Sequence, residues 1–430
     1  MMTLPRDHPQ RRGLAGEVHA RPFETVPTPA RLSYLALLID GEARGVELEQ
    51  VAQLCRQHGV APPVAGDTHF SAELGAMRLK WERHGEFSGF MVIVPGVGAA
   101  PFAEVAAASL PDGWLQSLPG QTVVAVHAEL RPAPVAGVPH AAEVARHFGG
   151  RMIVGSAIGD GIAYAYTDFH VHDDGCSRLL VYDAGLNPRQ AGRMLQRLFE
   201  IESYRMLALL ALPIAREQLP RIAVIERALS EVTEGISRES GRDEDLLHGL
   251  TRMAAEVESS IAAGQFRYGA CRAYSQLVDT RIGELRERRL SGLQTMQEFM
   301  SRRFAPAVAT CLTVSQRLRE LSDRIAQANT LLATRVGIVR ERQNQQLLAS
   351  MDRRARLQLR LQRTVEGLSV AAIVYYVVGV VGLAAKGLKA GGAPLNPDLV
   401  VGAAVPLCLG AVLLMLRRAR RSLADSSHDD

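Results

Sequence analysis

The sequence predicts a chain of three parts: a mixed α+β N-terminal domain with a largely antiparallel sheet, a long α-helical and coiled-coil stalk, and a C-terminal hairpin of two transmembrane helices. Three observations predict this order. Short apolar segments separated by turn residues occupy the first 187 residues. Proline-poor sequence with helical periodicity follows, and two long uncharged segments lie near the end. We expect domain boundaries at 1–187, 188–366 and 367–416, with a basic and then acidic tail at 417–430.

The N-terminal domain contains more predicted strands than helices, and short turns such as Gly-Asp-Gly at 159–161 join several of them. Strands joined by short turns pair antiparallel, which favours a largely antiparallel sheet over a doubly wound parallel one. The expected strands are 31–39, 77–83, 89–94, 122–130, 152–156, 162–170 and 177–182. The expected helices are 45–58, which ends before Gly59, and 188–212, which ends before Pro213.

The middle of the chain is predicted to be helical because Pro306 is the only proline between Pro220 and Pro394. We expect helices over about 221–264, 268–304 and 307–366. In the third helix, apolar residues alternate separations of three and four, as in a coiled-coil seam: Cys311, Val314, Leu318, Leu321, Ile325, Ala328 and Leu332. Apolar residues return at Leu347, Met351, Leu357, Leu361, Val365 and Leu368. A long helix with a narrow seam needs a partner, either the preceding helices or other copies of the chain.

Two segments, 367–385 with 19 residues and 399–416 with 18, contain no charged residue. At about 1.5 Å per helical residue, each crosses most of a ~30 Å hydrocarbon core. Basic residues flank the two segments: Arg353, Arg354, Arg356, Arg360 and Arg363 before the first, and Arg417, Arg418, Arg420 and Arg421 after the second. The connection between them has only Lys386 and Lys389. The positive-inside rule therefore predicts two membrane spans with both termini and the soluble domain in the cytoplasm, and arginines near lipid headgroups. The alternative is a buried helical hairpin in a soluble domain.

Composition excludes several classes of protein. The formal net charge is +4, from 49 basic and 45 acidic residues, which gives no case for nucleic-acid binding. The five cysteines are far apart and form no Cys-x-x-Cys pair, so we expect reduced thiols rather than a disulfide framework or a zinc ribbon. The first residues lack the apolar stretch of a cleavable signal peptide. The phosphate-loop, His-Glu-x-x-His, Gly-x-Ser-x-Gly and dinucleotide-binding motifs are all absent from the sequence, which weakens an enzyme interpretation.

One candidate metal site is His170, His172 and Asp168. Two residues apart on an expected strand, the histidines emerge on one face about 7 Å apart. Imidazole and carboxylate are ligands for a divalent metal, the only cofactor that the sequence indicates. A surface turn with polar side chains is the alternative.

A second candidate is a ligand pocket in which the N-terminal segment packs on the sheet, formed by His8, Glu17, His19, Arg21, Trp81, Glu82, Arg83 and His84. The same residues could instead form salt bridges that hold this segment down. A third group, Glu200, Glu202, Tyr204 and Arg205, interrupts an apolar helix. Buried charges need partners, so we expect an ion-pair network between domains there.

Four stretches carry a resemblance to a bacterial family of membrane-anchored proteins of unknown function: DHPQRRGLAGEVHARPFE (7–24), RLKWERHGEFSGF (78–90), QRLFEIESYRMLALLALP (196–213) and TVEGLSVAAIVYYVVG (364–379). They occur in this order from the N-terminus to the first span. The resemblance implies a bacterial origin and a membrane anchor, hence the inner membrane, and it brings no catalytic residues. In layout the chain also resembles two-span CorA-like magnesium transporters. It lacks their Gly-Met-Asn signature, having AAKGLKAGGAPLN at 384–396.

The leading hypothesis is therefore a membrane-anchored cytoplasmic interaction or sensing protein that self-associates through its stalk. Its expected partners are the lipid bilayer and other copies of the chain, and the sequence identifies no other protein partner. A CorA-like cation channel or transporter is the second hypothesis, because of the layout. A metal-dependent enzyme that uses His170 and His172 is the third.

Overall fold

A computed structural model describes residues 6–19, 22–135, 137–238, 242–390, 392, 394 and 396–425, without the side chains of residues 17–19, 416, 417 and 419–425. The chain divides into two compact units, Met1–Thr330 and Leu331–Asp430.

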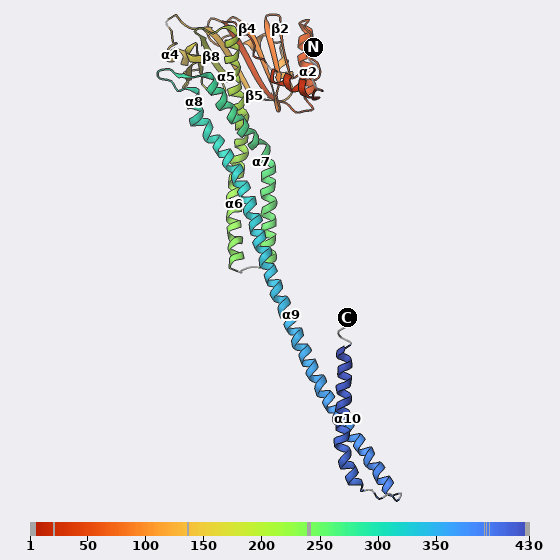
Figure 1. The fold of residues 1–430 in the computed structure, drawn as a ribbon. Helices are drawn as coiled ribbons and strands as arrows, with labels where there is room; N and C mark the ends of the chain where they lie inside the picture. The colour runs from red at the N-terminus through yellow and green to blue at the C-terminus, as the bar shows by residue number, and fades with distance from the viewer. Residues whose placement is uncertain are drawn as a thin grey trace. The chain divides into compact units, whose positions relative to one another are not determined.

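Within the described part of the first unit, nine strands form one mixed sheet in the order β2-β3-β4-β1-β5-β8-β7-β6-β9 (Figure 1). The neighbouring pair β5 and β8 is parallel, and the other paired strands are antiparallel. The predicted mixed, largely antiparallel sheet is therefore confirmed. The strands are β1 Ala30–Leu38, β2 His69–Leu74, β3 Met77–Arg83, β4 Phe87–Pro95, β5 Gln121–Pro132, β6 Val154–Ile158, β7 Ala163–Thr167, β8 Ser177–Asp183 and β9 Arg288–Arg289.

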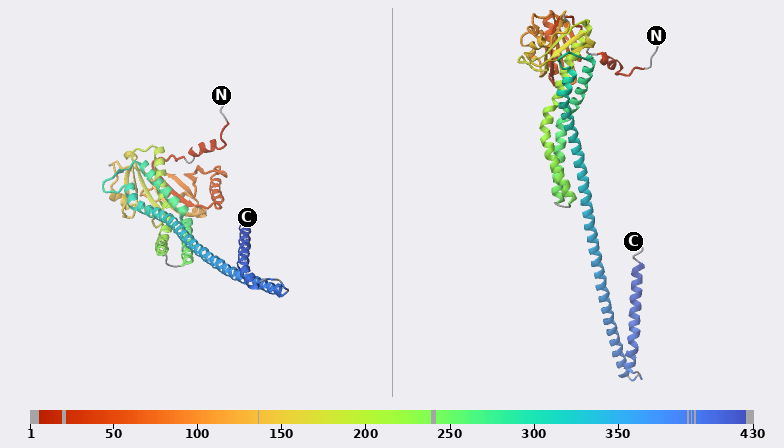
Figure 2. Two further views of the ribbon diagram at one scale, coloured as in Figure 1. Left: turned by 60° about the horizontal axis from the view of Figure 1, so that its bottom comes forward. Right: turned by 90° about the vertical axis from the view of Figure 1, so that its left-hand side faces the viewer.

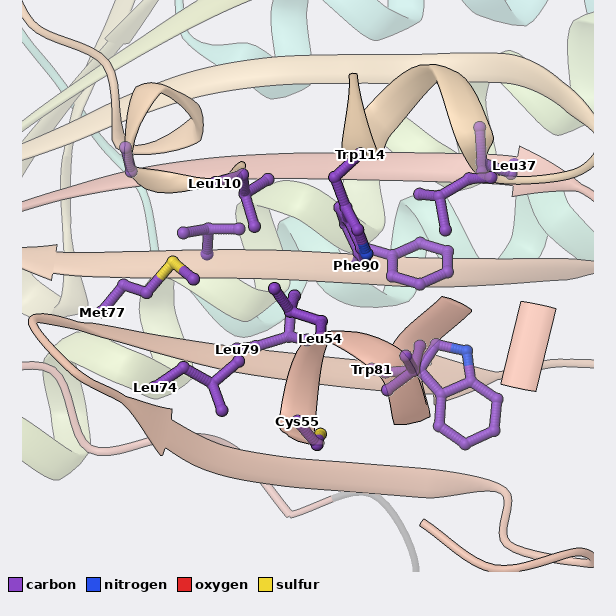
Figure 3. Close-up of a cluster of buried hydrophobic side chains, with 14 of the residues drawn as sticks. Leu37, Leu54, Cys55, Leu74, Met77, Leu79, Trp81, Phe90, Leu110 and Trp114 are labelled. Atoms are coloured by element: carbon purple, nitrogen blue, oxygen red, sulfur yellow. The ribbon is translucent and has the colours of Figure 1, made fainter. Parts of the chain in front are cut away.

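One face of the sheet is covered by short helices: α2 (Arg44–Gln57), η1 (Ala106–Ser109) and α3 (Trp114–Ser117). Figure 3 shows Leu54 and Cys55 of α2 in one cluster with Leu79 and Trp81 of β3. A second cluster lies beneath α4 (Ala141–Arg146) and contains Val144, Phe148, Ile153, Ala157, Tyr166, Leu180 and Leu290. These two clusters form the core on this side of the sheet.

The opposite face of the sheet packs against α5 (Pro188–Leu209). This helix begins with a capping box in which the Asn187 side chain accepts from the Gln190 backbone, and Pro188 occupies the first turn. The ring of Tyr34 on β1 stacks on that of Phe199, with centroids 4.9 Å apart. Helix α5 ends at Leu209 rather than 212, because Pro213 fits the first turn of the next helix, where its missing N–H is not needed.

Helices α6 (Ala211–Ser237), α7 (Asp243–Leu285) and the first part of α9 (Ala305–Ala390) lie side by side (Figures 1 and 2). The predicted helix boundary between 264 and 268 was wrong, since both residues lie inside α7. Gly264 does not end the helix. A Cβ there would lie 2.4 Å from Tyr268 Cε2, so this glycine makes room for the tyrosine one turn later. The remaining short elements are α1 (Arg11–His19), η2 (Gly159–Gly161), α8 (Met296–Phe299) and η3 (Met300–Phe304), a turn of π-helix.

Helix α9 confirms the predicted continuous helix over 307–366 and continues through the first apolar segment. In the second unit, α10 (Pro397–Asp425) contains the second apolar segment, and Gly382 of α9 lies against Val401 of α10. Both apolar helices are long and apolar enough to cross a membrane, and their side chains are largely exposed. The predicted three-part architecture is thus present.

Candidate functional site

A buried ion pair lies where the sheet meets α5. Lys80 and Glu82 are alternate residues of β3, so their side chains emerge on one face of the strand. Lys80 Nζ lies 2.8 Å from Glu82 Oε1, and the two side chains are 3% and 10% exposed. The same ammonium donates to Oε1 of Gln196 on α5 at 3.2 Å. Breaking a buried pair by removing one partner typically costs about 3–5 kcal/mol. This pair therefore helps to fix α5 on the sheet.

The polar contacts continue from α5 to α7. Gln196 Nε2 donates to Glu200 Oε1 at 2.9 Å, and Glu200 accepts from the guanidinium of Arg281 on α7. Arg281 also contacts Glu284 Oε1 at 3.1 Å, and Glu284 accepts from Arg197 Nε at 2.8 Å. A single chain of matched charges thus runs from the sheet through α5 to α7.

The group of polar residues predicted in α5 does enter ion pairs. Besides the Glu200–Arg281 pair, Glu202 accepts from Arg205 Nη2 at 2.7 Å. Tyr204 instead stacks on Tyr274 of α7, with ring centroids 5.6 Å apart. The predicted ion-pair network is confirmed, but it joins elements of one compact unit rather than two domains.

The phenols beside this network are held neutral. Burial raises the pKa of Tyr34 above its ordinary value, and Ser203 Oγ lies 3.1 Å from the Tyr34 hydroxyl. Burial likewise raises the pKa of Tyr274, which bonds to Glu86. Matched charges and neutral phenols are the pattern of a structural connection between sheet and helices rather than of acid–base catalysis.

The other face of β3 contains a buried carboxylate. Glu47 of α2 is fully buried and accepts from Trp81 Nε1 at 2.6 Å and from Arg83 Nη2 at 3.2 Å. The Arg83 guanidinium lies over the Trp81 ring, 4.9 Å from its centroid. Both partners of Glu47 come from β3, so this cluster fixes α2 on the sheet.

The residues predicted to line one ligand pocket lie on opposite faces of the sheet. Trp81 and Arg83 bind Glu47, whereas Glu82 points to the opposite face and pairs with Lys80. His84 stacks on Phe87, with ring centroids 4.2 Å apart. Successive residues of a strand point to opposite faces, so Glu82 is separated from Trp81 and Arg83. His8 is exposed. Arg21 and the side chains of Glu17 and His19 lie outside the described residues, so their part of the pocket stays a prediction.

The expectation that His170 and His172 lie on a strand was wrong, because β7 ends at Thr167. Asp168 turns the chain there, its Oδ1 accepting from the His170 backbone N–H at 3.2 Å. His172 Nε2 lies 3.0 Å from Asp168 Oδ2, and its Nδ1 lies 3.1 Å from Arg151 Nη1. Each ring nitrogen of His172 therefore lies close to a charged side chain. Across the described residues, no group of three or more His, Cys, Asp or Glu side chains could hold a metal ion. A metal at this pair stays a prediction.

A serine–histidine contact that the sequence did not indicate lies in the centre of the sheet. Ser33 on β1 and His127 on β5 are directly paired, and Ser33 Oγ lies 2.9 Å from His127 Nδ1. The Ala107 backbone N–H donates to the same hydroxyl at 2.9 Å. Burial lowers the pKa of His127, so the ring is held neutral. An apolar cavity of about 50 Å³ beside the pair is lined by Trp114 and by Cys176, whose pKa burial raises to about 11.

The predicted seam of α9 is buried, from Cys311 at 0% to Leu332 at 2% exposed. Its partners in the first unit include α6, through the pair Arg317–Glu226 at 2.6 Å. Beyond this part of the helix, the predicted apolar residues of α9 are 57–76% exposed: Leu347, Met351, Leu357, Leu361, Val365 and Leu368. Packing within the chain therefore accounts for the first part of the seam and leaves the second part uncovered.

The structure describes the side chains of only some of the arginines that are predicted to flank the membrane segments. Arg353, Arg354, Arg360 and Arg363 are exposed on α9, and Arg418 is exposed on α10. The side chains of Arg417, Arg420 and Arg421 lie outside the described residues.

Comparison with protein families adds one finding. A family described as a protein of unknown function (DUF3422) matches residues 6–423. The chain belongs to this family. No curated protein and no solved structure shows significant similarity to the chain. The four stretches that carried the resemblance lie within the match, so the predicted membership in a family of unknown function is confirmed. The DUF3422 description gives no activity and no functional residues. The two C-terminal apolar helices are long and apolar enough to cross a membrane.

Proposed function

We propose that this protein is a cytoplasmic interaction or sensing module that is anchored in a bacterial inner membrane and self-associates through the exposed part of its stalk. One observation carries the proposal: α9 continues without a break from the buried seam, through an exposed segment with large apolar side chains, into the first apolar segment. The expected orientation follows from the arginines at 353–363 and 417–421, which favour the cytoplasmic side.

Five of the exposed apolar side chains of α9 lie on one face of the helix, whereas others such as Leu348 and Leu357 lie outside it. Leu347, Met351, Leu361, Val365 and Leu368 fit the a and d positions of a single heptad register, with Arg354 and Gln358 at the positions between. The three with the highest exposure in this set, Leu368, Leu361 and Met351, are 76%, 68% and 64% exposed. Burying such side chains stabilises an assembly by about 1.5–3 kcal/mol each. We call these five residues the stalk face.

A second copy of the chain is the occupant that fits the stalk face best. Copies inserted in one membrane have the same orientation, so their stalks meet in parallel and in register. Each apolar residue then faces its own copy, as in a parallel coiled coil. In the second unit, a groove of about 640 Å³ between α9 and α10 is lined by Leu361 and Val365, together with Val412 and Met415. It gives a partner helix room to approach.

Disulfide cross-linking in membranes tests this arrangement. In a Cys408→Ser background, Met351→Cys places a thiol on the stalk face, whereas Ala349→Cys places it on the opposite side of the helix. We expect a covalent dimer from Met351→Cys and none from Ala349→Cys under the same mild oxidant. Equal cross-linking of both variants, or a monomer by light scattering in mild detergent, contradicts self-association through this face. A ring of more copies with cation flux in liposomes favours a channel instead.

Labelling from one side of the membrane tests the anchor separately. A membrane-impermeant maleimide added to intact spheroplasts is expected to label Lys389→Cys in the connection between the spans. It is expected to label Ser422→Cys in the tail only after lysis. The reverse pattern contradicts the proposed orientation, and labelling of both sites before lysis contradicts a two-span anchor.

A further inference from the structure

Two cysteines that are far apart in the sequence meet in the helical bundle of the first unit. Cys271 lies on α7 and Cys311 on α9, and both are 0% exposed. The register of the two helices brings them together. Ser322 Oγ of α9 donates to Glu258 Oε1 of α7 at 2.8 Å. Cys271 lies 13 residues after Glu258, and Cys311 lies 11 residues before Ser322. Because antiparallel helices rise about 1.5 Å per residue, this difference of two residues offsets Cys271 from Cys311 by only about 3 Å along the helix axes.

The thiols contact each other directly. They share a hydrogen bond in which Cys271 donates to Cys311. This bond lowers the pKa of Cys311 and raises that of Cys271, and Arg216 of α6 also lowers the pKa of Cys311. Burial opposes this lowering, but the net direction favours Cys311 as the thiol of the pair that ionises first.

A groove between α7 and α9 lies beside this pair, although neither cysteine lines it. It has a volume of about 450 Å³ and is lined by Tyr268 and Arg272 of α7 and by Ser315 and Arg319 of α9. Tyr268 and Arg272 flank Cys271 in sequence, and Ser315 is one turn after Cys311. The Tyr268 hydroxyl donates to Gln218 of α6 at 2.6 Å, which fixes the ring beside the thiols.

We propose that Cys271 and Cys311 are a redox modification site, which a hydroperoxide converts to a reversible disulfide between α7 and α9. The Cys311 thiolate attacks one oxygen of hydrogen peroxide, which breaks the O–O bond and gives a sulfenic acid and hydroxide. The Cys271 sulfur then attacks the Cys311 sulfur, and water leaves. In total, two thiols and one hydrogen peroxide give one disulfide and two water molecules. A dithiol reductant reverses the change by thiol–disulfide exchange and is itself oxidised to a disulfide.

The disulfide closes a loop that contains β9, α8 and the start of α9. Because a cross-link restricts the unfolded chain, the oxidised first unit is expected to unfold at a higher temperature than the reduced one. The proposal is independent of the stalk face, since both cysteines belong to residues 1–330.

Thiol counting on the full-length protein in detergent tests the site. After exposure to hydrogen peroxide and an acid quench, the protein is unfolded and alkylated, and its peptides are mapped by mass spectrometry. We expect five alkylated cysteines in the reduced protein and three after peroxide, with one linked peptide pair containing residues 271 and 311. Dithiothreitol added before the quench restores all five. Five alkylated cysteines after peroxide, or a link between any other pair, overturns the proposal.

Matched variants separate this chemistry from general oxidation. Cys55→Ser removes another buried thiol and is expected to leave the 271–311 link intact. Cys271→Ser abolishes the link and also the rise in unfolding temperature on oxidation. If that rise persists in Cys271→Ser, the disulfide is not its cause and the proposal fails. Peptide mapping of the unsubstituted protein needs no variant, so the test holds even if a substitution prevents folding.

Discussion

Gly192 of α5 lies directly against the main chain of Glu24, so that a Cβ on residue 192 would sit 1.7 Å from the Glu24 carbonyl oxygen. The chain before β1 crosses α5 at this point, and the Val26 N–H donates to the Pro188 carbonyl at 3.0 Å. The glycine therefore permits the N-terminal segment to pack on the helix that covers the sheet.

Gly192→Ala is expected to destabilise the first unit by about 3 kcal/mol or more, because backbone atoms must move to accept the methyl group. The matched control is Gly269→Ala in α7, where an added Cβ has nothing within 4 Å. That control is expected to be neutral or to stabilise by up to about 1 kcal/mol. Denaturant unfolding of both variants measures the difference, and equal midpoints would contradict the close approach.

The hydrogen bond from Trp81 to the buried Glu47 carboxylate gives a second prediction. Trp81→Phe removes the indole donor and leaves a buried charge with one fewer partner, at a cost of roughly 1.5–3 kcal/mol for the hydrogen bond. Trp114→Phe is the matched control, because Trp114 Nε1 donates to the neutral Gln50 carbonyl at 3.2 Å. Its hydrogen bond is expected to cost about 0.5–1.5 kcal/mol. Urea unfolding compares the two, and a larger loss for Trp114→Phe would show that Glu47 does not depend on Trp81.

His127 predicts a pH dependence of stability. Burial lowers its pKa in the folded state, so the unfolded chain binds more protons between that lowered value and the ordinary value of about 6.5. Folding is therefore favoured above pH 6.5 or so, and stability falls as the pH drops through this window. Asp174 opposes the shift and Arg178 adds to it.

Replacement of His127 by glutamine is expected to flatten this part of the stability curve, whereas replacement of the exposed His170 leaves it unchanged. Unfolding midpoints between pH 5 and pH 8 provide the measurement. An unchanged slope in His127→Gln would assign the effect to another group, such as His147, whose pKa burial also lowers.

Individual strands and helices show what the pattern of apolar residues in the sequence can and cannot predict. Strand β3 follows from alternation in 77–83, and the α9 seam follows from its separations of three and four. Strand β2 was missed because it lies at the edge of the sheet, where several of its side chains are exposed and its apolar pattern is weak. Strand β9 has only two residues.

The contacts of the candidate sites are harder to predict than the elements. Lys80 meets Gln196 across 116 residues, Ser33 meets His127 across 94, and Cys271 meets Cys311 only when two helices fold back on each other. Residue type and spacing predict such groups within one element. They do not predict which element lies opposite, because that depends on packing of the whole unit.

The stalk face gives the last prediction, through two neighbouring leucines of α9. Leu347 and Leu348 are 61% and 64% exposed, so a charge at either position has a similar effect on the isolated chain. They differ by about 100° around the helix. Leu347 lies at a d position of the stalk face and Leu348 beside it, outside the seam. Leu347→Glu places like charges opposite each other in a parallel dimer and is expected to weaken self-association at least tenfold, which corresponds to about 1.4 kcal/mol. Leu348→Glu is expected to leave it nearly unchanged. Light scattering over a dilution series in mild detergent measures both, and equal dissociation of the two variants would place the contact on another face of α9.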